Sequence, residues 1–580
     1  MGTSFPTLFG SSLLILSAAG CVPDVKVSSE GNTGGSAGVG GASHMGGSSA
    51  AGGKTTTGGA MSLGGTTTAG GTSATGGAVT TGGTVATGGV TNLGGVISTG
   101  GSPATGGFVN TGGNMATGGA IATGGATATG GAAATGGAVS AGGNMATGGA
   151  TATSSNAPWS KRWGSAGADY GNSLIVDAND NIYVTGGYTG TTDFGNGPLS
   201  SVAGTMDIFL AKYSASGNCL WVRSFGGTGN EFGANLSLDN QGNVLLIGTT
   251  TGTVDFGGGS VSAPGTRNTF IAKFDENGAH VWSKCFGMSP ETVGYTVAPD
   301  SRDNLYITGY FDGQVNFGGA TLATAGDRDI FLAKLDANGN HLWSKRFGSS
   351  AYYDSAQALV VEPVTDSVLI SGLLGQPTTV GGAVLGTGTD NLFLAKFDSA
   401  GAAVWSKGFA SGSGYQLALE PSGNIVLGGW CEGSIDLGGG PLPCANKYGI
   451  ILAKFDSSGN HIWSKGFGSP NGVAATVAIE GTGDIVTAGL FDGSINIDGT
   501  TLTSVGSTDA FIAAFTGDGQ LLWHKQYGDS ATQGINRIAV NSTNNVLAIG
   551  TFAGTIDFGN GLFTSLGDLD MCLANIVPPQ

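Results

Sequence analysis

The sequence predicts an all-β fold, a closed seven-bladed β-propeller with four-stranded blades, and three observations support this prediction. Tryptophans recur every 58–62 residues over the C-terminal part of the chain. Each interval contains four short runs rich in β-branched and aromatic residues, as expected for strands. The array also begins with an isolated fourth strand and ends on a third strand. The repeated tryptophans are Trp159, Trp221, Trp282, Trp343, Trp405, Trp463 and Trp523.

Composition divides the chain into three segments. Residues 1–21 form a signal segment, residues 22–155 a low-complexity tether with a six-residue Gly-Gly period, and residues 156–580 the propeller. A large share of the 113 glycines lies in the tether, and the whole chain has a net charge of −17. Because that charge repels phosphate backbones and anionic lipid surfaces, nucleic-acid binding is not expected.

The first segment resembles a bacterial lipoprotein signal. An apolar stretch centred on Leu13-Leu14-Ile15-Leu16 is too short to span a bilayer and is followed by small residues and Cys21. The resemblance implies that Cys21 is acylated and becomes the mature N-terminus. We therefore expect an exported protein, either a lipoprotein of the outer membrane or cell surface or a freely secreted protein. Contact with a membrane is expected only through that lipid anchor.

The tether is expected to be a disordered chain. Between Gly31 and Ser155 its only charged side chain is Lys54, and it has little apolar surface to offset the entropy cost of ordering. A regular stalk is the alternative, because the second residue after each Gly-Gly pair is often apolar and could form a continuous row. That row contains Val79, Val85, Ile97, Val109, Met115, Ile121, Val139 and Met145.

The strand pattern within one repeat is clear in the unit that follows Trp282. Strands are expected at residues 295–297, 305–309, 330–335 and 341–347, separated by turns such as Asp336-Ala-Asn-Gly339. Runs such as Ile208-Phe-Leu-Ala211 are apolar almost continuously, which is typical of strands covered on both faces, as in stacked blades.

The two ends of the array are complementary. Residues 159–164 form a fourth strand without its first three, and residues 570–574 form a third strand without its fourth. Pairing them completes the last blade and closes the ring. An open solenoid is the alternative, but it would not require this complementarity.

The repeats of residues 159–575 resemble the SBBP family of bacterial β-propeller repeats. The resemblance is carried by Asp300-Ser-Arg-Asp-Asn304-Leu-Tyr-Ile-Thr-Gly309 and by Asp329-Ile-Phe-Leu-Ala-Lys334. It implies a propeller fold and a surface or secreted location. It implies no activity, because such domains occur mostly on proteins of undetermined role.

Repeated polar residues are better explained by the blade than by one catalytic site. His280, His341 and His461 share one position of the repeat and would lie far apart in a ring, so no catalytic residue and no cofactor is expected. Acidic residues in the loop between the second and third strands could form an acidic, calcium-responsive face, with solvated turns as the alternative. These residues are Asp193, Asp255, Asp436 and Asp557, and the connections between blades add Asp169, Glu231, Glu291, Asp354 and Asp529.

One blade carries a distinctive loop. Cys431 and Cys444 lie in it, and an oxidising compartment would favour a disulfide between them. Trp430 beside this loop is the residue at which we first expect a binding site.

These observations favour a non-catalytic binding or scaffold module that contacts an unknown protein or glycan. Two alternatives remain: a carbohydrate-active propeller enzyme such as a lyase or hydrolase, and a purely structural component of an envelope or matrix. An enzyme should break the repeat with singular residues that converge on one face. The few singular residues, such as Tyr352, Tyr353, Asp354, Glu432 and Lys447, come from different blades.

Overall fold

The computed structural model describes residues 157–579, except 203, 351, 445–447 and 469–470, together with the backbone of short strands between residues 43 and 141. The chain forms two units, one of residues 25–153 and one that contains residues 154–580. The signal segment with Cys21 lies outside the described residues, so lipidation stays a prediction. No helix among the described residues has the length and apolar character needed to cross a membrane.

The glycine-rich unit contains seventeen short strands, from β1 (Ser43–Met45) to β17 (Val139–Ala141). Most of these strands occupy the four residues between two Gly-Gly pairs, and each pairs in parallel with a strand 18 residues away. The result is three sheets of six, six and five strands. The register makes Met61, Val79, Ile97 and Met115 successive partners in one sheet.

This backbone has the regular period of the stalk alternative, while composition predicts a disordered tether. In such a stalk, interior strands would gain a hydrogen-bonded neighbour on each side. That gain depends on stacking successive 18-residue turns and is not visible in the composition of a single repeat.

Hydrogen exchange and circular dichroism on residues 25–153 alone test the stalk. We expect a β-type spectrum and a set of slowly exchanging amides in the strands, because paired N–H groups are protected. Rapid exchange at every amide would instead support the disordered tether.

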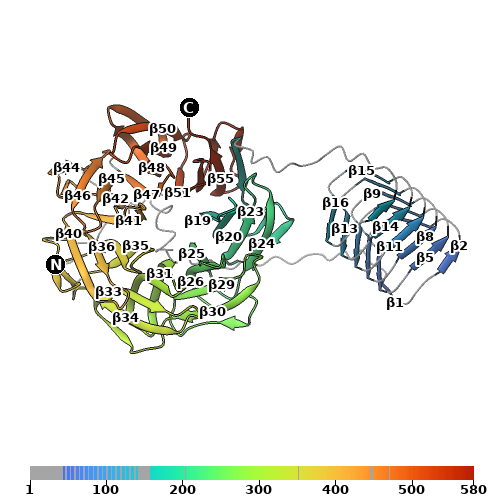
Figure 1. The fold of residues 1–580 in the computed structure, drawn as a ribbon, viewed down its shortest axis with the longest axis horizontal. Coiled ribbons are helices and arrows are strands. Elements are labelled where there is room, and N and C mark those ends of the chain that lie inside the picture. Colours follow the sequence, from blue (N-terminus) through green and yellow to red (C-terminus); the bar gives the residue numbers. More distant parts are fainter. Residues whose placement is uncertain are drawn as a thin grey trace, which may run out of the picture. The chain divides into compact units, whose positions relative to one another are not determined.

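The second unit is a ring of seven blades, which confirms the predicted all-β propeller (Figure 1). In every blade the first strand is innermost and the fourth is outermost, and each innermost strand contacts those of both neighbouring blades. Blades 1–3 consist of β19 (Tyr170–Val176), β20 (Ile182–Tyr188), β23 (Asp207–Tyr213) and β24 (Cys219–Phe225); β25 (Glu231–Leu238), β26 (Val244–Thr250), β29 (Asn268–Phe274) and β30 (His280–Phe286); and β31 (Ser289–Pro299), β32 (Leu305–Val315), β33 (Leu322–Leu335) and β34 (His341–Phe347).

The remaining blades repeat this order, and the last one takes its fourth strand from the start of the array. Blades 4–7 consist of β35 (Ser355–Val361), β36 (Val368–Leu374), β39 (Asn391–Phe397) and β40 (Ala403–Phe409); β41 (Gly412–Leu419), β42 (Ile425–Cys431), β45 (Gly449–Phe455) and β46 (His461–Gly466); β47 (Asn471–Ile479), β48 (Ile485–Ile497), β49 (Thr500–Phe515) and β50 (Leu521–Tyr527); and β51 (Gln533–Val540), β52 (Val546–Phe552), β55 (Asp570–Ile576) and β18 (Trp159–Trp163).

The expected strand ends differ from the observed ones at the connection between the second and third strands. In blade 3, β32 and β33 continue past residues 309 and 330 and pair with each other through the connection. Five other blades place a separate small hairpin there. These hairpins are β21 (Thr191–Asp193) with β22 (Pro198–Ser200), β27 (Val254–Asp255) with β28 (Ser260–Val261), β37 (Thr378–Val380) with β38 (Ala383–Leu385), β43 (Ser434–Asp436) with β44 (Pro441–Pro443), and β53 (Thr555–Asp557) with β54 (Leu562–Thr564).

The ring closes as predicted, through antiparallel pairing of β18 with β55. Trp163 is 5% exposed and stacks on Tyr213 of blade 1, with the ring centroids 5.1 Å apart. Arg162 forms an ion pair with the buried Asp570. The closing strand therefore joins blade 7 internally and also packs against blade 1.

The repeated tryptophan ties each blade to the next one. Nε1 of Trp282 on β30 donates a hydrogen bond to the carbonyl of Ala337 in the next blade, at 3.1 Å. Gly339 in the same turn has a φ of 75°, and a Cβ there would lie 3.0 Å from the Trp282 ring. Five other tryptophans make the same bond at 3.1–3.3 Å, namely Trp159, Trp221, Trp343, Trp405 and Trp463.

Replacing Gly339 by alanine tests this junction. Gly242 provides a matched control, because its φ is also positive at 80° but no atom lies within 4 Å of its added Cβ. We expect Gly242→Ala to lower the free energy of unfolding by about 1–2 kcal/mol from backbone strain alone. Gly339→Ala should lower it further because the indole must also move. Equal losses in chemical denaturation would contradict the tryptophan contact.

A buried lysine on the third strand makes a second junction. Lys334 forms an ion pair of 2.8 Å with Asp300 in its own blade and donates to the carbonyl of Ser399 in the next blade, at 3.2 Å. Burial raises the pKa of Asp300, but hydrogen bonds from Lys334 and Asn304 outweigh it and leave the pKa below its usual value. The same lysine–carboxylate pair occurs in four other blades, as Lys212–Asp177, Lys273–Asp239, Lys396–Glu362 and Lys454–Glu420.

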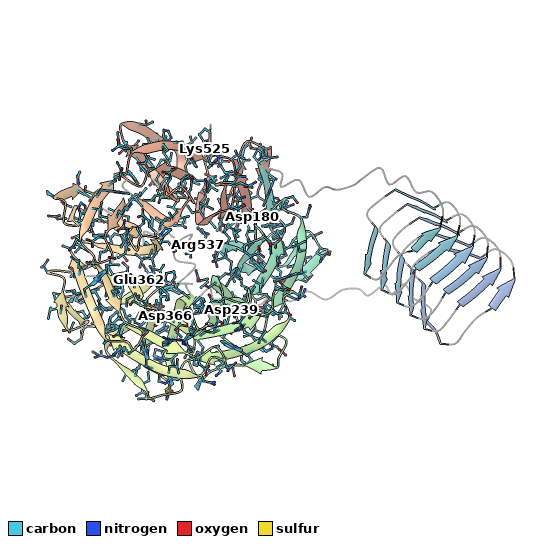
Figure 2. All side chains as sticks on the ribbon, viewed as in Figure 1. Asp180, Asp239, Glu362, Asp366, Lys525 and Arg537 are labelled. Carbon is cyan, nitrogen blue, oxygen red and sulfur yellow. A yellow bond between two sulfur atoms is a disulfide. The ribbon has the colours of Figure 1, made fainter. Side chains whose placement is uncertain are left out.

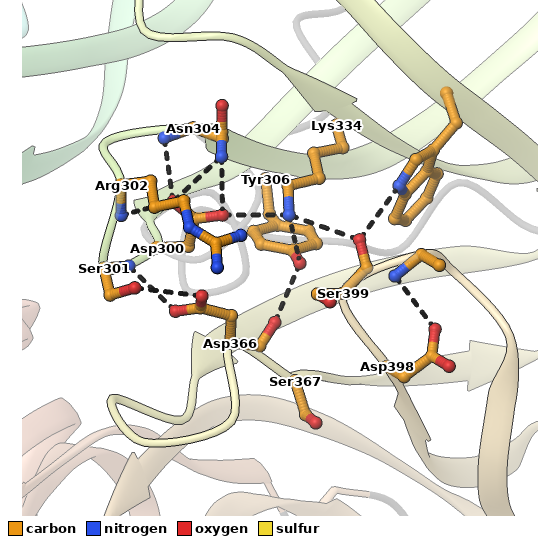
Figure 3. Close-up of polar contacts among 12 residues, drawn as sticks. Asp300, Ser301, Arg302, Asn304, Tyr306, Lys334, Asp366, Ser367, Asp398 and Ser399 are labelled. Carbon is orange, nitrogen blue, oxygen red and sulfur yellow. Dashed lines mark hydrogen bonds and ion pairs between the residues drawn. The ribbon is translucent and has the colours of Figure 1, made fainter.

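The hairpins between the first and second strands make a third junction. Asp180, Asp239 and Asp366, labelled in Figure 2, belong to three such hairpins. Asp366 has a φ of 54° and accepts hydrogen bonds from the backbone and hydroxyl of Ser301 in the preceding blade, both at 2.9 Å (Figure 3). Asp180 accepts the same pair of bonds from Ser542 of blade 7. The Asp-rich turns that carry the family resemblance therefore connect blades.

Candidate functional site

The acidic loop residues predicted as a calcium face each cap one small hairpin on the rim of the ring. Oδ1 of Asp193 accepts the N–H groups of Gly195 and Gly197, at 2.8 and 3.1 Å. Asp255, Asp436 and Asp557 make the equivalent pairs of bonds at 2.7–3.2 Å, and all four are exposed. Each carboxylate therefore caps its own exposed turn, as the solvated-turn alternative predicts. The four carboxylates belong to four different blades.

The Asp-Phe-Gly triplet at these turns fills the widening gap between blades. Phe256 is 1% exposed, and its ring lies 5.2 Å from Phe225 on the outermost strand of blade 1 and 4.8 Å from Phe270 of blade 2. The tip of the same hairpin, at Gly258, contacts the ring of His280 at the start of the outermost strand. The triplet is therefore a packing element of the rim.

The second set of acidic residues does not join the first. Asp169, Glu231 and Asp354 are fully buried beside the innermost strands, while Glu291 and Asp529 are half-buried. Asp169 accepts N–H groups from Ser165 and Thr189, and Asp354 accepts those of Ser349 and Gly375. Among the described residues, no group of three or more His, Cys, Asp or Glu side chains could hold a metal ion.

Burial raises the pKa of Asp169 to about 6, of Glu231 to about 7 and of Asp354 to about 6. A carboxyl group whose pKa is raised by folding binds more protons when folded than when unfolded. Stability therefore falls as pH rises from about 4 through these values.

We expect the melting temperature to be higher at pH 5 than at pH 8. Glu231→Gln should raise the melting temperature at pH 8 and weaken this dependence, because it removes the group with the highest of the three values. Asp193→Asn on the exposed rim is the control and should leave the pH profile unchanged. A melting temperature that rises steadily from pH 5 to pH 8 would contradict the conclusion that burial disfavours the charged forms of these three carboxyl groups.

The distinctive loop of blade 5 contains a disulfide between Cys431 and Cys444, whose Cα atoms lie 5.8 Å apart. Cys431 ends the second strand and Cys444 follows the small hairpin, so the bond closes the loop onto the blade. Cys219, Cys285 and Cys572 are free thiols.

Trp430, the predicted binding residue, belongs to a cluster of aromatic side chains, which we call the aromatic cluster: Tyr353, Tyr415, Trp430 and Tyr448. Trp430 is 7% exposed and meets Tyr448 edge-on, with the ring centroids 4.9 Å apart. Tyr415 lies on the innermost strand β41, where burial raises its pKa to about 12 and its side chain packs against the buried group that contains Trp430. Tyr353 lies close enough to influence that pKa and is 49% exposed.

The sequence placed the singular residues on different blades, and the structure brings some of them together. Tyr353 precedes the first strand of blade 4, whereas the other three members of the aromatic cluster belong to blade 5. The sequence could not show this convergence, because it arises only when blades 4 and 5 pack side by side. Lys447, another singular residue, lies outside the described residues.

Three of the eight described non-glycine residues with a positive φ lie in or beside the aromatic cluster. Asp390, Ser411 and Tyr448 have φ values of 54°, 56° and 46°, in the left-handed region that favours glycine. Their carbonyls accept hydrogen bonds from Gly412, Glu432 and Gly472, at 2.6, 2.9 and 2.7 Å. Strain of this kind persists only where surrounding contacts enforce it, and it occurs frequently at binding sites.

Two carboxylates adjoin the aromatic cluster. Burial, and then the negative charge of Glu432, raise the pKa of Asp390. Both carboxylates also act on Tyr448, whose pKa is raised by burial and by these charges. The cluster therefore combines aromatic faces with hydrogen-bond acceptors.

Sequence analysis missed one further residue, Arg537 on the innermost strand β51. Its Nη1 donates a hydrogen bond to Oε1 of Gln416 on β41. Burial lowers the pKa of Arg537 to about 10. A detectable signal was present, because Arg537 is the only Lys, Arg or His on the seven innermost strands.

No protein-family model matches the chain, so the resemblance to SBBP repeats stays a prediction. An uncharacterized WD repeat-containing protein of Acanthamoeba polyphaga mimivirus is 24% identical over 501 residues, which cover 68% of this chain and 36% of that protein. The regulatory protein FlaEY of Caulobacter vibrioides is 25% identical over 199 residues, which cover 32% of this chain and 20% of that protein. The chain thus matches 36% of the first relative's length and 20% of the second's.

Two solved structures that resemble the chain have low overall similarity. The Dos1 propeller has a TM-score of 0.36 and 10% identity, and covers 72% of this chain and 95% of its own. An inactive virginiamycin B lyase from Staphylococcus aureus has a TM-score of 0.32 and 8% identity, and covers 73% of this chain and 100% of its own. The protein is a seven-bladed β-propeller with a WD repeat-containing relative.

Proposed function

We propose that this protein is an exported, non-catalytic binding module that recognises a protein or glycan through the aromatic cluster. One observation carries the proposal: aromatic side chains from two neighbouring blades converge at Tyr353, Tyr415, Trp430 and Tyr448. The repeat itself accounts for most other polar residues, because they join blades or cap turns.

The chemistry of the aromatic cluster suits such recognition. Aromatic rings with polar ends provide contact area at low entropy cost and occur frequently at binding hot spots. The strained backbone around Asp390, Ser411 and Tyr448 would hold these rings in place before a ligand arrives, which limits the cost of binding.

Location is part of the proposal. Export through the signal segment, with or without acylation of Cys21, would deliver the propeller to the cell surface or the medium. The Cys431–Cys444 bond is stable in such an oxidising compartment and would be reduced in a bacterial cytoplasm.

Glycan-array and pull-down measurements on the full chain test the binding function. Tyr353→Ala should weaken binding of the captured ligand at least tenfold, since truncating a central aromatic contact typically costs about 2 kcal/mol or more. Leu522→Ala is the control, because Leu522 is equally exposed at 49% but lies on an outermost strand. Equal loss in both variants, or no ligand in either screen, would contradict the proposal and favour a structural envelope or matrix component.

A carbohydrate-active enzyme is the second candidate, and the carboxylates Asp390 and Glu432 favour it. A carboxyl group with a raised pKa beside a charged one can act as a general acid. Release of reducing ends from a glycan by the wild type, abolished by Asp390→Asn, would establish this candidate and overturn the non-catalytic proposal.

A further inference from the structure

The positive charge of Arg537 breaks the repeat at one defined position. Each innermost strand contains a bulge, and Arg537 is the residue that follows the bulge of β51. The equivalent residues of the other six blades are small or uncharged. They are Ser173, Asn235, Thr296, Ala358, Gln416 and Thr476.

Arg537 points into the interior of the ring. It hydrogen-bonds Gln416 of blade 5, although β47 of blade 6 lies between their strands in the ring order. Figure 2 labels Arg537 inside the ring formed by the blades. The side chain is half-buried, so solvent reaches it along the axis.

The guanidinium group has unused binding capacity. It carries five N–H donors, and Gln416 is a neutral acceptor for one of them. Within the described part of the chain, none of the ion pairs includes Arg537. A charged group kept in the interior without a carboxylate is costly unless a ligand or water satisfies it.

The side chains around this position are polar or aromatic. The bulged residues of the innermost strands are half-buried, while the residues on either side of them are mostly buried between blades, so the bulged side chains face the axis. Aside from Ala234, the described ones offer amide groups and phenol rings and no aliphatic surface. They are Asn172, Tyr295, Gln357, Tyr415 and Asn536.

We propose that Arg537 is the centre of a site for acidic saccharides on the propeller axis. A uronate carboxylate would pair with the guanidinium fork, the amides would bond to hydroxyl groups, and a tyrosine ring would cover a sugar face. A peptide ligand fits less well because, Ala234 aside, the described side chains that face the axis are polar or phenolic and offer little apolar surface for its side chains. The inference rests on the proposed function and names its ligand class; Tyr415 belongs both to the aromatic cluster and to this lining.

Titration calorimetry on the full chain tests the site, with a trisaccharide of galacturonic acid and the neutral trisaccharide of galactose as probes. We expect the wild type to bind the acidic probe at least tenfold more tightly, and added salt to weaken this binding. Arg537→Ser should reduce the affinity for the acidic probe at least tenfold without changing that for the neutral one. The affinity of Arg537→Lys for the acidic probe should lie between those of the wild type and Arg537→Ser, because lysine keeps the charge but lacks the planar guanidinium fork.

Lys525→Ser is the matched control, since it removes one positive charge from an outermost strand and should change neither affinity. Arg537→Ser is expected to fold, because serine occupies the same position in blade 1, and its melting temperature checks this. If Arg537→Ser does not fold, the affinity of Arg537→Lys for the acidic probe decides whether the site exists. No preference of the wild type for the acidic probe, or equal affinity in the Arg537 variants, would overturn the site.

The two proposals fail differently. Binding of another glycan or a protein that depends on Tyr353 but not on Arg537 would remove the axial site and leave the proposed function intact. Absence of every ligand in the screens would remove both.

Discussion

Pairing between β18 and β55 is the interaction on which the propeller depends. It supplies the fourth strand of the last blade from the beginning of the array, so the two ends of the repeat are held in one sheet. Trp163 and Arg162 then extend the pairing into packing against blade 1 and an ion pair with Asp570. Without this strand, β55 would present an unpaired edge and blade 7 would lose its outer face.

Closure has a consequence for each pair of adjacent blades, because a ring must be filled at every junction. Tryptophan indoles bridge six of the seven junctions, buried lysines and Asp-rich turns add bonds at several of them, and the Asp-Phe-Gly phenylalanines fill the rim. Blade 7 lacks the buried lysine–carboxylate pair, because Asn541 occupies the position of the carboxylate and Asn575 that of the lysine. Replacing both partners with neutral groups avoids leaving one charge buried alone.

Most polar residues are explained by these junctions, and the exceptions therefore stand out. The aromatic cluster combines residues of blades 4 and 5, and Arg537 occupies a position where the other six blades have small or uncharged residues. Tyr415 and Arg537 lie on innermost strands, where side chains from several blades can reach one ligand. A repeat fold of this kind can acquire recognition by changing a few inner positions while the junctions stay constant.

The sequence alone determined the number of blades, their four-strand order and the closure of the ring. Tryptophan spacing and complementary ends can be read directly from the order of residues along the chain. It also indicated Trp430 and the Cys431–Cys444 pair. Only the tertiary structure separated the rim carboxylates such as Asp193 from the buried ones such as Glu231. It also brought Tyr353 next to blade 5 and Arg537 next to Gln416. These relations join residues from different blades, which become neighbours only when the ring has closed.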